Sequence, residues 1–275
     1  MTALVLAVVV IGTLVTGSTA LWAALVTCFC AAAAWEFVRL SPAASRSQIV
    51  TSCVVLAALV ITFAIALFVG DDNSQIAATL FKTFLPFLLL AVAFWLAVVP
   101  IQLSRRLIVL NTWPSVLTMP VVIGAAWLSA VLLQRVGARF LIAVIVVTVV
   151  ADVAGYFFGR RFGRVKLAPA ISPGKTREGA VGGIVAAALW TVAMSFYLGL
   201  CTGLWQLLMA AGAGAFLGAS AVMGDLWESQ LKRQAGVKDS SQLLPGHGGV
   251  LDRIDAQLAV LPLATVLLML VKPLW

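Results

Sequence analysis

Charged residues are scarce in this chain. They make up 10% of its 275 residues, whereas hydrophobic residues make up 63%, and the mean hydropathy is +1.11. Soluble domains carry about a quarter charged residues, so this composition excludes a soluble, disordered or collagen-like protein and predicts a polytopic membrane protein. Because an ionised side chain is costly inside a bilayer, the places where the few charges gather are the first candidates for a functional site.

Cysteine and histidine are also rare. Cys28, Cys30, Cys53 and Cys201 lie inside or at the ends of hydrophobic segments, and none forms a CxxC pair. We interpret them as small core residues rather than as disulfide or metal-binding residues. The single histidine, His247, has no evident Ser/His/Asp or Cys/His partners, which argues against acyl transfer.

Long hydrophobic runs fill most of the sequence. A transmembrane helix needs about 20 apolar residues, and the charged or Gly/Pro-containing breaks divide the chain into nine candidate spans. They are residues 2–16, 19–38, 48–69, 76–102, 114–134, 140–159, 179–200, 203–223 and 254–271. The first is short and the fourth contains Lys82 and Pro86, so eight spans are the alternative. Met1 and Thr2 provide no basic segment before the first run, so we expect an uncleaved span rather than a signal peptide.

The sequence therefore predicts an all-α, polytopic integral membrane protein. We see no linker, repeat or soluble region, and expect a single transmembrane domain over residues 1–275. Residues 1–147 are interpreted as N-terminal spans and 148–275 as a C-terminal catalytic half. That half contains two polar stretches, the motif loops 160–178 and 224–255.

The distribution of Lys and Arg predicts the orientation. With strict alternation of nine spans, 14 of the 18 basic residues fall on one side. The four on the other side are Lys82, Arg135, Arg139 and Lys272. Cytoplasmic loops are enriched in Lys and Arg, so the N-terminus and both motif loops are expected to be cytoplasmic. The net charge of +8 is then explained by interaction with the membrane surface and with anionic substrates rather than with nucleic acid.

Polar residues begin inside the sixth span. Asp152 lies in an apolar helix, where an ionised carboxylate needs a partner or a water-filled cavity. The segment Ser172–Thr176 precedes span seven, and its hydroxyls and backbone N–H groups at a helix N-terminus suit a phosphate. Its Gly-Lys-Thr lacks the first glycine and the preceding strand of a P-loop, so we reject a Walker motif.

The second motif loop holds five of the ten acidic residues. On helices, Asp225 and Glu228, like Asp252 and Asp255, present two carboxylates on one face. Between these pairs lie Lys232, Arg233, Lys238, Asp239, His247, Gly248 and Gly249. Carboxylate oxygens can hold Mg²⁺, which commonly also binds substrate phosphates, and the cations would neutralise phosphate charge. Phosphoryl or nucleotidyl transfer is the reaction class that this pattern favours.

Two further features bear on packing. Glycines in spans seven and eight predict close helix approach; they are Gly182, Gly183, Gly212, Gly214 and Gly218. Glu36, beside Trp35 near the end of span two, either extends to the cytoplasmic interface or faces the bundle, and the sequence leaves both open.

The stretch from Ser229 to Asp255 resembles the signature of the phosphatidate cytidylyltransferase (CDP-diacylglycerol synthase) family. The matching positions are Ser229, Leu231, Lys232-Arg233, Lys238-Asp239, Ser241, Leu244-Pro245, His247-Gly248-Gly249-Val250 and Asp252-Arg253-Ile254-Asp255. Upstream, Lys166-Leu167-Ala168-Pro169 with Ser172–Thr176 resembles the family's second loop, and Gly224-Asp225-Leu226 with Glu228-Ser229 resembles its Gly-Asp-Leu motif. The resemblance covers residues 148–275, with Trp35-Glu36 similar earlier. The sequence departs from the family at Val153-Ala154-Gly155-Tyr156, where many members have Ser or Thr after the aspartate.

The resemblance implies that CTP and phosphatidate become CDP-diacylglycerol and pyrophosphate. It also implies a metal centre at Asp225 and Asp252, for which we expect Mg²⁺; a second metal ion and a homodimer are left open. The residues assigned to catalysis are Asp225, Lys232, Arg233, Lys238, Asp239, His247, Asp252, Arg253 and Asp255. The residues assigned to substrate binding are Asp152, Ser172, Lys175, Thr176, Glu228, Ser229, Gly248 and Gly249. We expect a multi-pass protein of the bacterial inner membrane with a cytoplasmic active site.

Two other functions are weighed against this one. A CTP-dependent polyprenol or lipid kinase would use a similar site but would transfer the γ-phosphoryl group. A lipid transporter or scramblase would bind phosphate headgroups without chemistry, and would be expected to distribute polar residues through the bundle rather than on one side.

Overall fold

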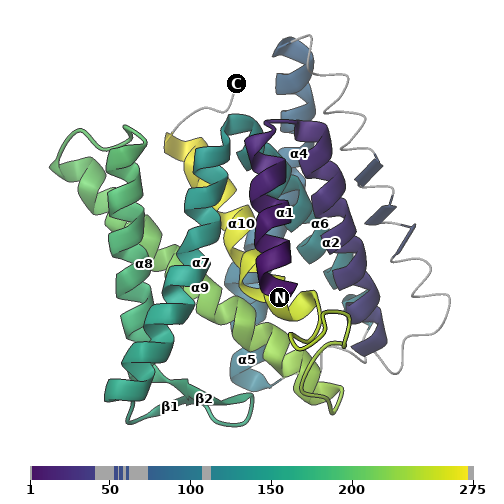
Figure 1. The fold of residues 1–275 in the computed structure, drawn as a ribbon, viewed down its shortest axis with the longest axis vertical. Coiled ribbons are helices and arrows are strands. Elements are labelled where there is room, and N and C mark those ends of the chain that lie inside the picture. The colour runs from purple at the N-terminus through teal and green to yellow at the C-terminus, as the bar shows by residue number, and fades with distance from the viewer. Residues whose placement is uncertain are drawn as a thin grey trace.

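The protein is a bundle of long helices with one small β-hairpin at its lower end in Figure 1. This computed structural model describes residues 2–40, 53, 54, 56, 57, 60, 61, 74–106 and 113–271. The expected third span, 48–69, therefore lies mostly outside the described residues.

The helices follow the apolar runs of the sequence. They are α1 (Thr2–Val15), α2 (Thr19–Leu40), α4 (Ser74–Ala93), the π-helical turn η1 (Phe94–Val98), α5 (Val99–Arg105), α6 (Trp113–Val136), α7 (Ala138–Phe162), α8 (Arg177–Tyr197), α9 (Leu204–Gln234) and α10 (Leu251–Val271). Seven helical stretches among the described residues are long and apolar enough to cross a membrane. With 14 residues, α1 is shorter than the about 20 that a full span needs. The polytopic membrane class is thus confirmed, and the count of nine stays a prediction.

Among the described residues, a departure from the all-α fold follows α7. Strands β1 (Lys166–Ala168) and β2 (Ser172–Thr176) pair antiparallel, with Lys166 opposite Thr176 and Ala168 opposite Ser172. The expected helix N-terminus at Thr176 is confirmed, because the Thr176 hydroxyl oxygen accepts a hydrogen bond from the Gly179 N–H at 3.2 Å and caps α8. Ser172–Thr176 itself is a strand, whose position the apolar pattern did not indicate.

Glycines allow α7, α8 and α9 to pack backbone against backbone. A Cβ atom on Gly183 of α8 would lie 2.5 Å from the Ala151 carbonyl oxygen of α7, and one on Gly214 of α9 would lie 2.7 Å from the Ala187 carbonyl oxygen of α8. No side chain fits at such distances, so the prediction of close helix approach holds at these positions. It is wrong for Gly212, where nothing lies within 4 Å of an added Cβ.

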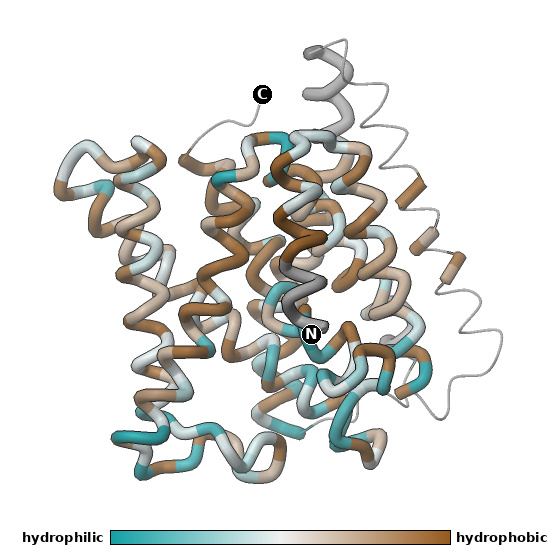
Figure 2. Tube along the Cα trace, in the orientation of Figure 1, coloured by the Kyte–Doolittle hydropathy of each residue, from teal (hydrophilic) through white to brown (hydrophobic). Residues whose placement is uncertain are grey.

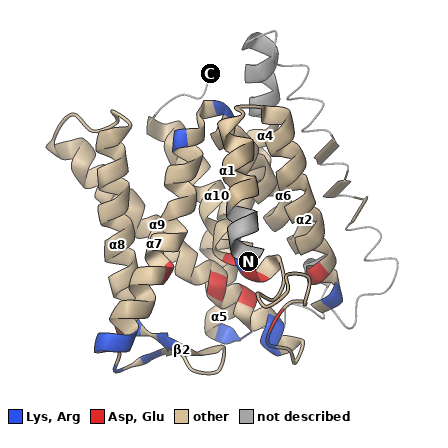
Figure 3. Ribbon diagram, viewed as in Figure 1, with Lys and Arg blue, Asp and Glu red and all other residues tan. Residues whose placement is uncertain are grey.

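Charged side chains gather at one end of the bundle, here called the charged end, while apolar residues fill its middle (Figures 2 and 3). The last turns of four helices that reach this end carry Arg39 (α2), Arg105 (α5), Arg160 and Arg161 (α7), and Lys232 and Arg233 (α9). The hairpin and the loop between α9 and α10 also lie there. The two motif loops therefore share one end of the molecule.

This arrangement predicts the result of a labelling experiment. Ala170 in the hairpin turn and Gln242 in the loop before α10 are exposed at the charged end, whereas Thr202 is exposed between α8 and α9, at the other end. In a variant lacking the native cysteines, we expect a membrane-impermeant maleimide to label Ala170→Cys and Gln242→Cys from the same side of the membrane. Thr202→Cys, the control, should be labelled only from the opposite side. Labelling of the first two positions from different sides would contradict the fold.

Candidate functional site

Helix α9 carries a row of polar side chains toward the charged end. Asp225, Glu228, Ser229 and Lys232 are three or four residues apart, so they share one face of this 31-residue helix. The Ser229 hydroxyl donates to Asp225 Oδ1 at 3.2 Å. The prediction that Asp225 and Glu228 lie on one helical face is confirmed.

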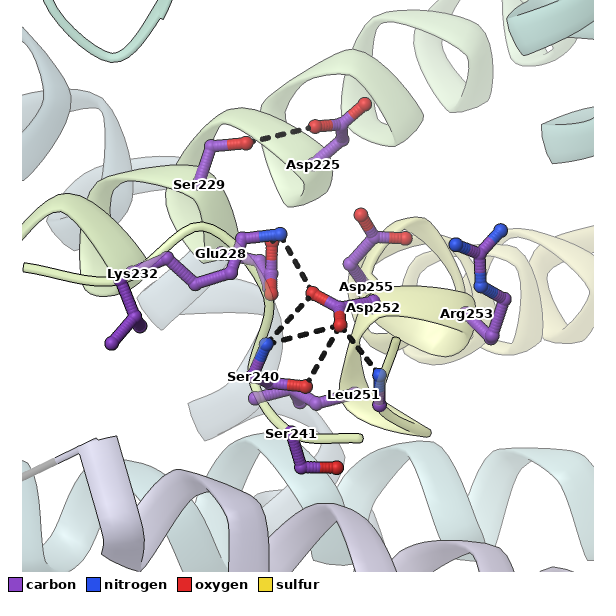
Figure 4. Close-up of polar contacts among 12 residues, drawn as sticks. Asp225, Glu228, Ser229, Lys232, Ser240, Ser241, Leu251, Asp252, Arg253 and Asp255 are labelled. Carbon is purple, nitrogen blue, oxygen red and sulfur yellow. Dashed lines mark hydrogen bonds and ion pairs between the residues drawn. The ribbon is translucent and has the colours of Figure 1, made fainter. Parts of the chain in front are cut away.

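Lys232 joins α9 to the start of α10. Its Nζ lies 2.7 Å from Glu228 Oε2 and 2.7 Å from Asp252 Oδ1 (Figure 4). The contact with Glu228 is ionic rather than an oriented hydrogen bond. The side chains of Lys232, Glu228 and Asp252 are only 13%, 1% and 6% exposed. One ammonium group thus joins two buried carboxyl groups, and we call these three residues the acid–base cluster.

Asp252 also ties the preceding loop to α10. Its Oδ2 accepts hydrogen bonds from the Gly249 N–H at 2.7 Å, from the Ser240 N–H at 3.0 Å and from the Ser240 hydroxyl at 3.0 Å (Figure 4). Both carboxylate oxygens of Asp252 therefore have donors. Gly249, which the sequence places among the substrate-binding residues, donates its N–H to Asp252.

Glu36 enters the same region from α2. It is fully buried and accepts hydrogen bonds from the loop before α10 and from the first residues of that helix. Of the two positions that the sequence left open, Glu36 therefore faces the bundle. The assignment of site residues missed it, although a carboxylate in an apolar span was the signal that could have identified it.

The glycine-rich turn before α10 closes on itself. The Leu244 N–H donates to the Gly248 carbonyl at 2.9 Å, and Gly246 and Gly248 adopt φ values of +73° and +78°, which favour glycine. His247 Nδ1 lies 3.3 Å from the Pro245 carbonyl oxygen, and Arg253 Nε donates to the His247 carbonyl at 3.0 Å. The turn thus places His247 and Arg253 together, outside the cavity described next.

A cavity of about 530 Å³ opens beside the acid–base cluster, between α7, the hairpin, the start of α8 and α9. Its lining includes the charged residues Asp152, Arg160, Lys166, Lys175 and Asp225, together with Thr176. Lys175 and Asp225 form an ion pair across it. This volume lies in the range of small-molecule sites, and a wall with three cations suits an anionic ligand.

The structure brings some of the predicted site residues together and separates others. Asp152, Lys175, Thr176 and Asp225 line the cavity, Glu228, Lys232 and Asp252 form the acid–base cluster, and Asp255 lies near both, interacting electrostatically with Asp152 and Asp225.

Arg233 links the two motif loops, because its Nε donates to the Ile171 carbonyl in the hairpin turn at 3.3 Å. Lys238 and Asp239 are exposed on the loop and do not line the cavity. Arg160 and Lys166 also line the cavity; both lie in the first motif loop, but neither was assigned a role in the site from the sequence.

The predicted metal ligands, Asp225 and Asp252, pair with different lysines, Lys175 and Lys232. Within the described part of the chain, no three His, Cys, Asp or Glu side chains form a group that could hold a metal ion. Mg²⁺ is commonly held by one or two carboxylates and completed by substrate phosphates and water. Asp225 faces the cavity, where substrate phosphates and water would complete such a site, whereas both oxygens of Asp252 already accept hydrogen bonds within the protein.

The acid–base cluster predicts a compensation effect. Removing one partner of a buried ion pair costs about 3 kcal/mol or more, so we expect Lys232→Met to lower the free energy of unfolding by about that amount. Glu228→Gln in the same chain should restore part of the loss, because it removes a buried acidic group that has lost its partner. Lys238→Met is the matched control on the exposed loop and should change stability by less than about 0.5 kcal/mol. Unfolding in mixed detergent micelles measures all three, and a double variant no more stable than Lys232→Met would contradict the proposed compensation.

Comparison with known proteins identifies the family of this chain. Residues 1–271 match the sequence model of the Cytidylyltransferase family. The phosphatidate cytidylyltransferase of Staphylococcus epidermidis is 42% identical over 132 residues, which are 48% of this chain and 50% of the relative. That of Pseudomonas aeruginosa is 43% identical over 145 residues, 52% of this chain and 53% of the relative, so the chain spans about half the length of these curated relatives. Because the family model covers nearly the whole sequence, the chain belongs to the cytidylyltransferase family.

Proposed function

We propose that this protein is a nucleotidyltransferase that transfers a cytidylyl group from CTP to phosphatidate, giving CDP-diacylglycerol and pyrophosphate for phospholipid synthesis. The observation that carries the proposal is the match to the Cytidylyltransferase family across residues 1–271. The names of the relatives supply the substrates. A cavity at the charged end of a membrane bundle, lined by cations, supports both.

The chemistry requires positioning and charge compensation more than a strong base. Phosphatidate carries an ionised phosphate at neutral pH, and one of its oxygens forms a bond to the α-phosphorus of CTP. The bond between the α- and β-phosphates breaks, and pyrophosphate leaves. The main obstacle is repulsion between two polyanions, which Arg160, Lys166 and Lys175 on the cavity wall would reduce.

In this proposal Asp225 and Asp252 would hold Mg²⁺, which would supply further charge neutralisation on the phosphates. Asp225 faces the cavity, whereas Asp252 belongs to the acid–base cluster. A second ion would depend on the same acidic residues. Lys175 and Lys232 balance the two carboxylates in the protein alone.

We further propose that the charged end faces the cytoplasm of a bacterial cell and that the bundle lies in the inner membrane. The excess of Lys and Arg at that end supports this orientation. The acyl chains of phosphatidate would then remain in the bilayer while its headgroup meets water-soluble CTP in the cavity.

Labelled CTP tests the reaction directly. We expect the α-phosphate label to appear in lipid when the purified protein is incubated in vesicles with phosphatidate, CTP and Mg²⁺, and the γ-phosphate label to appear in pyrophosphate. Vesicles without phosphatidate are the control. Transfer of the γ label to lipid would instead indicate a lipid kinase, and no transfer of either label would favour a transporter.

The metal assignment predicts the effect of two substitutions. We expect Asp225→Asn and Asp252→Asn each to lower kcat by about a hundredfold or more, because the charge that holds the metal against the phosphates is lost. A chelator should abolish activity in the unmodified protein, and added Mg²⁺ should restore it. Unchanged cysteine labelling would show that both variants insert normally. Full activity of Asp252→Asn with an unaltered Mg²⁺ requirement would overturn this assignment.

A further inference from the structure

Glu36 is a carboxylate that lies inside the bundle and receives four hydrogen bonds from one distant region. Its Oε1 accepts from the Ser241 hydroxyl at 2.6 Å and from the Val250 N–H at 2.9 Å. Its Oε2 accepts from the Leu251 N–H at 2.6 Å and lies 2.9 Å from the Ser240 hydroxyl, whose single hydrogen it shares with Asp252 Oδ2. The side chain is 0% exposed. More than two hundred residues separate Glu36 from each of these donors.

These contacts satisfy both the buried Glu36 carboxylate and the backbone N–H groups at the start of α10. A buried carboxylate is costly unless donors surround it, and the first N–H groups of a helix have no acceptor within the helix. The Val250 carbonyl accepts a bond from the Ile254 N–H, so the Val250 and Leu251 N–H groups are at that free end of α10. Glu36 accepts both, and its negative charge at the helix N-terminus is favourable. A side chain of α2 therefore caps α10.

The same carboxylate lies one step from the acid–base cluster. The Ser240 hydroxyl oxygen is 2.9 Å from Glu36 Oε2 and 3.0 Å from Asp252 Oδ2, so this hydroxyl lies between the two carboxylates. Leu251, whose N–H Glu36 accepts, is the residue before Asp252. A Cβ on Gly249 would lie 2.6 Å from both Glu36 oxygens, which shows how closely the loop packs on the carboxylate.

We propose that Glu36 is a positioning residue of the cytidylyltransferase. It does not line the cavity. It acts by fixing the Ser240–Ser241 segment and the first turn of α10 to α2, and these in turn hold Asp252 beside Lys232. The kinetic part of this inference rests on the proposed function, whereas the structural part does not.

Glu36→Gln tests the inference, because an amide has one acceptor oxygen and presents N–H donors where the second carboxylate oxygen stood. We expect hydrogen–deuterium exchange of the Val250 and Leu251 amides to become about tenfold faster or more, with peptides from α8 unchanged. We also expect kcat to fall by about tenfold or more while KM for CTP changes by less than about twofold, since Glu36 does not touch the substrate.

Thr27→Val is the matched control on the same helix. It removes the hydrogen bond that the Trp127 indole N–H donates to the Thr27 hydroxyl at 2.8 Å. Thr27 lies nine residues before Glu36, or about 13 Å away along the helix. It should change neither the exchange of α10 nor kcat. An equal loss of kcat in Thr27→Val would overturn the inference, because the effect would then be general damage to α2 packing. Unchanged exchange at Val250 and Leu251 in Glu36→Gln would also overturn it.

Ser241→Ala decides the matter if Glu36→Gln does not fold. It keeps the carboxylate and removes one of its four donors, so we expect a smaller loss of kcat, about two- to fivefold, and faster exchange across residues 241–251. Unchanged kcat and exchange in Ser241→Ala would refute the positioning role. If the unmodified protein transferred no cytidylyl group, the proposed function would fail while the exchange measurements still tested the contacts of Glu36.

Discussion

Three acidic side chains, Glu36, Glu228 and Asp252, are buried where α2, α9 and α10 meet. Each needs cations or hydrogen-bond donors around it, and this requirement determines how the three helices pack at the charged end. Lys232 balances Glu228 and Asp252, while hydroxyls and the free N–H groups of α10 surround Glu36. Apolar side chains can exchange neighbours at small cost, but a buried charge without its partner costs several kcal/mol. The polar contacts therefore favour a single arrangement of the three helices, whereas apolar packing alone would allow several.

The opposite face of α9 rests on aromatic rings. Trp227 stacks with Phe37 at a centroid distance of 6.2 Å and packs edge-on against Phe94 and Trp95. Its indole N–H donates to Gln102 Oε1 at 2.9 Å. Trp227 precedes Glu228 and Phe37 follows Glu36, so the same two helical turns supply both the aromatic contact and the buried acids. The π-helical turn η1 brings Phe94 and Trp95 to this contact.

The cavity depends on a different kind of contact. Gly183 and Gly214 let α7, α8 and α9 approach backbone to backbone, and the hairpin covers the end of α7 and the start of α8. Arg233 bonds the hairpin turn at Ile171, so the wall that carries Lys175 is fixed to the helix that carries Asp225. The cavity and the acid–base cluster consequently share α9, which places cations for phosphate binding next to the carboxylates proposed to hold the metal.

The sequence by itself determined the membrane class, most helix boundaries, the shared face of Asp225 and Glu228, and the helix start at Thr176. These features are local, because hydropathy and the 3.6-residue period act within one segment. The motif stretch also indicated the family. The sequence did not determine which way Glu36 faces, which lysine pairs with which aspartate, or that Arg160 and Lys166 reach the cavity while Lys238 does not. Only the tertiary structure decided these contacts. Charged residues far apart in the chain can pair only if their helices pack side by side, and helix packing is not a local property of the sequence.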